Sequence, residues 1–148
     1  MNTNNQLEVL QNYIGKEFTE SPSPFMHWLK PIVVSAERGK LSFQYTIRKE
    51  MTNPVGGLHG GVTAAIMDDI IGATMFSFNE EHFYTTVNNV IDYFAHASIH
   101  DIIIAETSII KKGKQMINAQ CEIWNHDRTR LIARGYSNLL KTNLKKES

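Results

Sequence analysis

The sequence predicts an α+β domain in which an antiparallel β-sheet curves around one long, buried helix. An apolar run extends from Val62 to about Phe78, two β-type runs precede it, and four follow it. The run is rich in alanine and methionine and has no polar face, which favours a buried helix over a strand. A curved sheet is then the element available to cover that helix.

The elements before the long helix each rest on a local pattern. Residues 6–15 place apolar side chains at helical spacing and end at Gly15, which favours a short amphipathic helix. The two prolines of the next segment, TESPSPFMHW, favour a loop. Two β-type runs, 32–36 and 41–47, flank ERGK, whose glycine marks a hairpin turn.

The chain after the long helix is predicted to be β-structure. Its four β-type runs are 83–94, 101–111, 115–125 and 130–140. Short polar connections separate them, which predicts an antiparallel meander of neighbouring strands. We expect three parts in all: an N-terminal helix and loop at 1–24, a domain at 25–141 and a polar tail at 142–148. Edge-to-edge pairing of two such sheets in a dimer would cover the exposed sheet edges and the surplus apolar helix surface.

Composition narrows the function classes. The 148 residues contain 15 Lys and Arg against 15 Asp and Glu, and without a basic surplus we expect no nucleic-acid partner. The single cysteine, Cys121, excludes an internal disulfide, and the polar start of the chain lacks the apolar core of a secretory signal. No apolar run is long enough to cross a bilayer. We therefore expect a cytoplasmic protein without a membrane partner.

The candidate chemistry lies in NPVGGLHGGVTAAIMDD, residues 53–69. At the start of a helix, Gly60 and Gly61 would let the backbone approach a ligand, with free N–H groups and the positive end of the helix dipole pointing at it. The alternative is that both glycines only permit a tight turn. A carboxylate at Asp68 or Asp69 is costly on an apolar helix unless it is hydrogen-bonded or faces a wet cavity. The alternatives there are a basic partner elsewhere or exposure in an interface groove.

The spacing of Gly60 and Asp68 constrains any joint role. Eight residues span about 12 Å along a helix axis, so the two cannot touch one reacting atom within a single chain. A shared site would therefore need the carboxylate of a neighbouring subunit, with the active site at a dimer interface.

The pattern N-x-x-G-x-L-H-G-G, with an aspartate eight residues after the first glycine of its final pair, resembles the PaaI-type acyl-CoA thioesterases of the hot-dog fold. The resemblance covers about residues 25–141. It implies hydrolysis of an acyl-CoA thioester to a free acid and coenzyme A, without metal or other cofactor. It further implies a homodimer that pairs into a dimer of dimers.

The resemblance also implies residue roles. The Gly60 N–H would bind the thioester carbonyl, and His59 would orient the loop or add a hydrogen bond. Asn53 would position water or substrate, and Asp68 of the opposite subunit would act as general base or nucleophile. Thr86 would stand near the water, although FYTTV also suits an ordinary strand. Asp69 would be the base if the helix were rotated.

The substrate's two ends have candidate binding residues. For the coenzyme A phosphates these are Lys111, Lys112 and Lys114 around Gly113, with Arg134 or Arg128 as further candidates, because cations at a turn can reach an extended anion. A solvated turn is the alternative, and His96 and Ala97 stand where relatives often have arginine and proline. The acyl pocket is expected at Met67, Ile71, Met75, Phe83 and Tyr84, which could also be plain core.

Two other functions fit the same resemblance. A non-catalytic acyl-CoA sensor would keep the fold without hydrolysis, but the carboxylate at position 68 argues against it. A hot-dog hydratase or dehydratase would need His59 and Asp68 to meet across the interface. The six histidines form neither HExxH nor a Cys/His pattern, so we expect no metal site.

Overall fold

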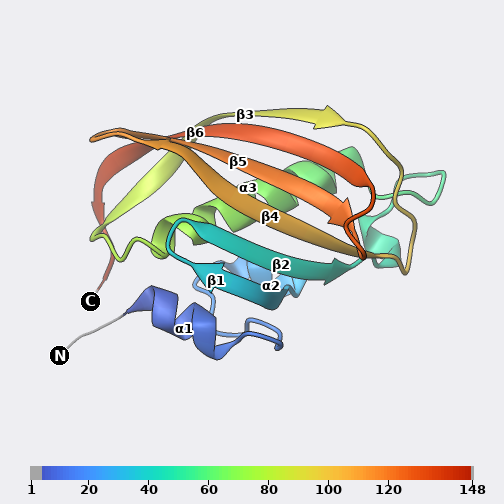
Figure 1. The fold of residues 1–148 in the computed structure, drawn as a ribbon, viewed down its shortest axis with the longest axis horizontal. Helices are drawn as coiled ribbons and strands as arrows, with labels where there is room; N and C mark the ends of the chain where they lie inside the picture. Colours follow the sequence, from blue (N-terminus) through green and yellow to red (C-terminus); the bar gives the residue numbers. More distant parts are fainter. Residues whose placement is uncertain (1–4, 148) are drawn as a thin grey trace.

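The computed structural model describes residues 5–147. Six antiparallel strands form one sheet in the order β1-β2-β4-β5-β6-β3, and the sheet curves around helix α3 (Figure 1). The strands are β1 (Ile32–Glu37), β2 (Lys40–Thr46), β3 (His82–Tyr93), β4 (Ile102–Lys112), β5 (Met116–Asn125) and β6 (Leu131–Lys145), and the helices are α1 (Gln6–Asn12), α2 (Pro24–Leu29), the 3-10 turn η1 (Lys49–Met51) and α3 (Gly60–Phe76). The predicted α+β class is confirmed.

Helix α3 is the centre of the core. Ile66, Met67, Ile70 and Ile71 are fully buried against the inner face of the sheet. Fully burying such a side chain stabilises the fold by roughly 1.5–3 kcal/mol before entropy is counted. Apolar side chains on nearly every face of α3 pack in the core and hold the helix in place. Any polar residue on it therefore needs a hydrogen-bond partner or a cavity.

The connection of β3 differs from the predicted meander. Strands β4, β5 and β6 do form a meander, but β3 pairs with β6 at the sheet edge and not with β4. The chain from 94 to 101 crosses the end of the sheet, where Leu58 N donates to Ala97 O and His100 N donates to Ile47 O. The short polar stretch SIHD is therefore part of a crossover between two strands that are not neighbours, and not a tight turn. Its backbone is hydrogen-bonded to the segment between β2 and α3.

The segment TESPSPFMHW contains helix α2, which was predicted to be a loop. Ser23 caps this helix by accepting a hydrogen bond from Met26 N, and Pro24 stands at its first position. Serine followed by proline is a helix-start signal, and the prediction gave weight only to the helix-breaking property of proline. Strand β6 also continues to Lys145, into the stretch predicted as a polar tail, where Thr142 Oγ1 donates to Phe83 O.

Candidate functional site

The loop before α3 is held by its own side chains. The Asn53 carboxamide oxygen accepts hydrogen bonds from Val55 N (3.1 Å) and Gly57 N (3.0 Å). Gly57 lies directly under the His96 ring, where a Cβ atom would come within 2.2 Å of ring carbon Cε1. Only glycine permits this approach. The carboxamide oxygen of Asn53 is thus used within the loop, whereas its side-chain nitrogen can donate a hydrogen bond to a ligand.

The start of α3 presents a free backbone donor. The His59 Nδ1 atom accepts from Gly61 N at 2.9 Å and caps the helix, so the proton of the neutral ring lies on Nε2. Gly60 is the first helical residue, and its N–H has no intrahelical acceptor. The Tyr93 hydroxyl donates to Gly60 O at 2.7 Å. We call Asn53, His59 and Gly60 the glycine half-site.

Asp68 lies on the exposed face of α3 beside β3. The Thr86 hydroxyl donates to Asp68 Oδ1 at 2.8 Å, and no cation pairs with this carboxylate among residues 5–147. Oδ2 is thus left to act on water or substrate. We call Asp68 and Thr86 the aspartate half-site. Because α3 is continuous from Gly60 to Phe76, the two half-sites of one chain are about 12 Å apart along the helix.

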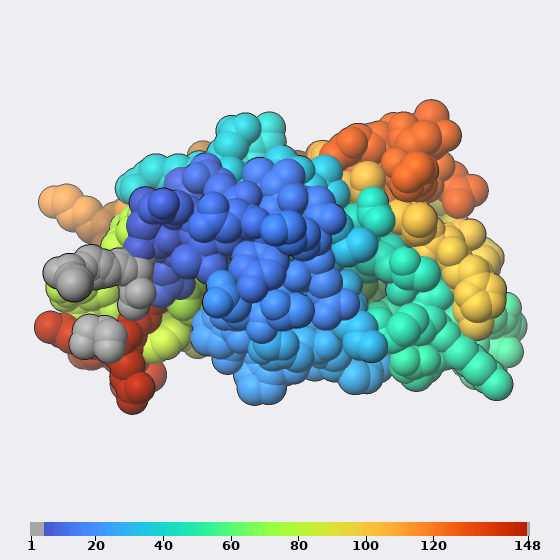
Figure 2. All heavy atoms as spheres, turned by 90° about the horizontal axis from the view of Figure 1, so that it is seen from below, coloured from blue at the N-terminus to red at the C-terminus, as the bar shows by residue number. Residues whose placement is uncertain are grey.

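A cavity of about 470 Å³ opens beside Asp68 and Thr86. Its inner wall is α3 and the neighbouring strands, and its outer wall is the N-terminal segment, which we define as residues 5–29. Figure 2 shows this segment, in blue, lying over the middle of one face of the molecule. The lining residues are Gln6, Val9, Leu10, Phe18, Glu20, Ser21, Pro22, Ser23, Met26, Asp68, Asp69, Gly72, Ala73, Phe76, Tyr84, Thr86 and Leu139.

The predicted acyl-pocket residues are mostly elsewhere. Only Tyr84 lines the cavity, while Met67, Ile71 and Met75 are buried in the core and Phe83 is partly exposed. Periodicity along α3 could not separate a cavity wall from core, because both are apolar. About half of the residues that line this cavity, from Gln6 to Ser23, belong to residues 1–24, which the sequence places outside the domain.

Asp69 occupies a different environment from Asp68. Its Oδ1 accepts from the Ser23 hydroxyl at 3.0 Å, while Oδ2 and the Tyr45 hydroxyl are buried without a partner in the described chain. Burial raises the pKa of Asp69 to about 6, with a smaller contribution from the Asp68 charge. Among residues 5–147 no basic group pairs with Asp69, and its side chain is half-buried; the expected position in a dimer-interface groove stays a prediction. Asp69 instead fastens the capping residue of α2 to α3.

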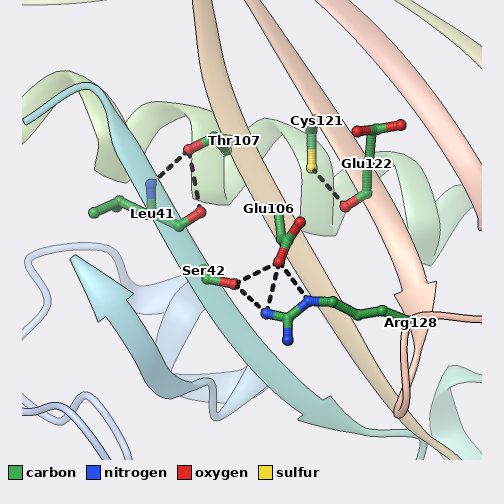
Figure 3. A network of polar contacts seen from close by, with 7 residues as sticks. All are labelled: Leu41, Ser42, Glu106, Thr107, Cys121, Glu122 and Arg128. Atoms are coloured by element: carbon green, nitrogen blue, oxygen red, sulfur yellow. Dashed lines mark hydrogen bonds and ion pairs between the residues drawn. The ribbon is translucent and has the colours of Figure 1, made fainter. Parts of the chain in front are cut away.

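The candidate coenzyme A residues lie far from Gly60 in the same chain. Lys112 Nζ pairs with Glu80 Oε1 at 2.6 Å, just beyond the end of α3, so the β4–β5 turn lies at the opposite end of the helix from Gly60. Arg134 pairs with Glu122 at 2.8 Å. Figure 3 shows the Arg128 guanidinium held by Glu106, at 2.6 Å, with Ser42 beside it. These three cations are already neutralised.

Strand β3 has one unpaired edge with apolar side chains. Val87 and Val90 are 56% and 57% exposed, and Tyr93 and Phe94 are exposed to a similar degree. An edge strand of this kind presents free N–H and C=O groups to another strand. Among the described residues, no helix is long and apolar enough to cross a membrane.

Comparison with known proteins identifies the family. A model of the thioesterase superfamily matches residues 55–132, more than half of the chain. The chain is 31% identical to mouse acyl-coenzyme A thioesterase 13 over 106 residues, 72% of this chain and 76% of the mouse protein.

Solved structures share the fold. Mouse thioesterase superfamily member 2 aligns with a TM-score of 0.72 and 28% identity over 95% of this chain and 98% of its own. The PaaI protein of the Escherichia coli phenylacetic acid operon aligns with a TM-score of 0.76 and 18% identity over 84% and 88%. The expected hot-dog fold and PaaI-type resemblance are confirmed, and the chain belongs to the thioesterase superfamily.

Proposed function

We propose that the protein is an acyl-CoA thioesterase that hydrolyses its substrate to a free carboxylic acid and coenzyme A. The observation that carries the proposal is the exposed Asp68 carboxylate, which pairs with no cation among residues 5–147 and accepts a hydrogen bond from Thr86 at the wall of a cavity large enough for an acyl group. Membership of the thioesterase superfamily and the name of the mouse relative, acyl-coenzyme A thioesterase 13, support the same reaction.

The reaction would use both half-sites. The Gly60 N–H polarises the thioester carbonyl and stabilises the negative charge that develops on its oxygen. His59 Nε2–H and the Asn53 side-chain nitrogen are further donors there. Asp68 either accepts a proton from the attacking water or attacks the carbonyl itself. In both cases the C–S bond breaks, and the thiolate of coenzyme A leaves and takes up a proton. In the second case water then hydrolyses the mixed anhydride between Asp68 and the acyl group, which releases the free acid and restores the carboxylate.

The half-sites would come from two subunits paired through β3. Along this strand, Thr86 contacts Asp68 and Tyr93 contacts Gly60 of the same chain. An antiparallel pair of β3 strands with its two-fold axis between Asn89 and Val90 would set Thr86 opposite the partner's Tyr93. That register brings each aspartate half-site to the partner's glycine half-site and covers the exposed valines. We expect two such dimers to associate further, as the resemblance implies.

The coenzyme A phosphates are proposed at the β4–β5 turn. Lys111 and Lys114 have no carboxylate partner among residues 5–147 and are free to bind an anion, whereas Lys112 would have to leave Glu80. Gly113 keeps the turn tight, since its N–H donates to Met116 O at 2.8 Å. The β4–β5 turn that serves a given site would belong to the subunit that supplies Asp68. Within one chain this turn is closer to Asp68 than to Gly60, because it lies at the end of α3 opposite Gly60.

Thiol release from a panel of aliphatic and aromatic acyl-CoA and acyl carrier protein substrates tests the reaction, with Asp68→Asn as the decisive variant. We expect Asp68→Asn to lose about 10²-fold or more in kcat, because general-base catalysis contributes that much. Glu37→Gln is the control: it removes an exposed carboxylate at the end of β1, outside the cavity lining, and should keep kcat within a few-fold. Unchanged turnover in Asp68→Asn would reject the assigned role, and ligand binding without thiol release in the wild type would make the protein a sensor.

A further inference from the structure

Gly72, in the middle of α3, has no structural reason to be glycine. Its backbone is helical, and a Cβ atom built on it would meet nothing within 4 Å. Gly57 and Gly135 differ, because a Cβ there would come within 2.2 Å of His96 and 2.5 Å of Met67 Sδ. Alanine is more favourable than glycine inside a helix. A glycine that the packing does not require therefore points to a need for the empty space itself.

That empty space belongs to the cavity beside the aspartate half-site. Asp68, Gly72 and Phe76 are spaced four residues apart, so they lie one above the other on one face of α3, and all three line the cavity. Gly72 is about 6 Å and Phe76 about 12 Å from Asp68 along the helix axis. The Phe76 ring is held by an edge-to-face contact with Phe83, with centroids 6.0 Å apart.

The N-terminal segment supplies apolar side chains to the wall of this cavity, beside the polar Gln6, Glu20, Ser21 and Ser23. Val9 and Leu10 of α1 and Phe18 of the following loop line the cavity from the N-terminal segment. An acyl chain that leaves a carbonyl near Asp68 and follows α3 toward Phe76 would have to pass between this wall and Gly72. Any side chain at position 72 would project into that passage.

We propose that Gly72 is a specificity-determining residue that sets the longest acyl group the enzyme accepts. The inference rests on the proposed thioesterase function and adds the path of the acyl group: from Asp68, over the bare backbone of Gly72, to Phe76 beneath the N-terminal segment. Residues beyond Gly72 contact only long acyl groups, so filling position 72 affects these and spares short ones.

Gly72→Leu and Gly72→Ala, assayed against acyl-CoAs of increasing chain length, test the proposal. We expect Gly72→Leu to lower kcat/KM for long acyl-CoAs by about ten-fold or more while acetyl-CoA hydrolysis stays within about two-fold. Gly72→Ala should shift the longest accepted chain by less and should raise the Tm. Glu8→Leu, which adds the same side chain on the exposed face of α1, should leave the chain-length profile unchanged.

A binding measurement separates this proposal from the function on which it rests. Dodecanoic acid should raise the Tm of the wild type and not of Gly72→Leu, whether or not the wild type releases thiol from any acyl-CoA. A wild type that shows this Tm shift but no thiol release would end the thioesterase proposal and keep the role of Gly72. A Gly72→Leu variant with the wild-type chain-length profile, or with equal losses at every length, would overturn the role of Gly72. Should Gly72→Leu not fold, Gly72→Ala decides by the same two criteria.

Discussion

Two neighbouring carboxylates on α3 have opposite relations to their surroundings. Asp68 is exposed and receives a hydroxyl hydrogen bond, whereas Asp69 is half-buried, with its Oδ2 fully buried and without a partner in the described chain. A carboxylate that transfers a proton must be able to reach water or substrate. A carboxylate that only holds a chain segment in place does not need this access. This contrast supports the proposed catalytic role of Asp68 and a structural role for Asp69.

Gly60→Pro isolates the contribution of one backbone N–H. Proline suits the first position of a helix, and His59 before it has the extended conformation (φ −64°, ψ 133°) that a residue before proline adopts. We expect kcat to fall about 10²–10³-fold, the usual cost of losing one oxyanion donor. Gly60→Ala keeps the N–H, and its Cβ would meet nothing nearer than the Tyr93 hydroxyl at 3.4 Å. Equal losses in both variants would show that the N–H is not what matters.

Asp69→Asn tests the burial of this carboxyl through stability. The pKa of Asp69 is raised from 3.8 to about 6, so the folded state binds this proton more tightly than the unfolded state. The stabilisation that the protonated Asp69 gives the folded state is therefore fully present below pH 4 and is lost as the pH rises through 6. Asparagine keeps the acceptor for Ser23 without the charge. Asp69→Asn should exceed the wild type in unfolding free energy by about 1–3 kcal/mol at pH 8 and by little at pH 4. Denaturant titrations at both pH values measure this, and a difference independent of pH would contradict it.

The elements themselves were largely predictable, because each has a local pattern. The apolar run from Val62 to about Phe78 favoured a buried helix over a strand, and the helix is found at Gly60–Phe76. The pairing partner of β3 was not predictable, because alternation identifies a strand without identifying its neighbour. Helix α2 was missed although Ser23 and Pro24 form a start signal, which shows that proline position matters more than proline count.

Some contacts of the candidate site could likewise be predicted from the sequence, and others could not. Asn53, His59 and Gly60 are close in sequence, so their common place at the start of α3 follows from the motif. Thr86 is 18 residues from Asp68 and Ser23 is 46 residues from Asp69, and no spacing rule joins such pairs. The resemblance supplied the first pair, and only the fold revealed the second. The cavity wall was missed because the N-terminal segment has no sequence feature that distinguishes a wall from a solvated helix.

The whole molecule, as one chain, holds two incomplete half-sites. They are separated by about 12 Å of rigid helix, and both touch the strand whose outer edge is free and apolar. We propose that a second copy completes both the sheet and the site. Each active site would then take its donor from one subunit and its carboxylate from the other.

Mixing two inactive variants tests whether each active site is shared between two subunits. Gly60→Pro and Asp68→Asn, unfolded and refolded together in equal amounts, should recover about a quarter of wild-type kcat, because half of the dimers are mixed and each mixed dimer has one intact site of two. Asp68→Asn mixed with Thr86→Val, two changes in the same half-site, should recover nothing beyond the more active of the two. If Gly60→Pro and Asp68→Asn stayed as inactive together as apart, although an affinity tag on one variant co-purified the other, the site would not be shared between subunits.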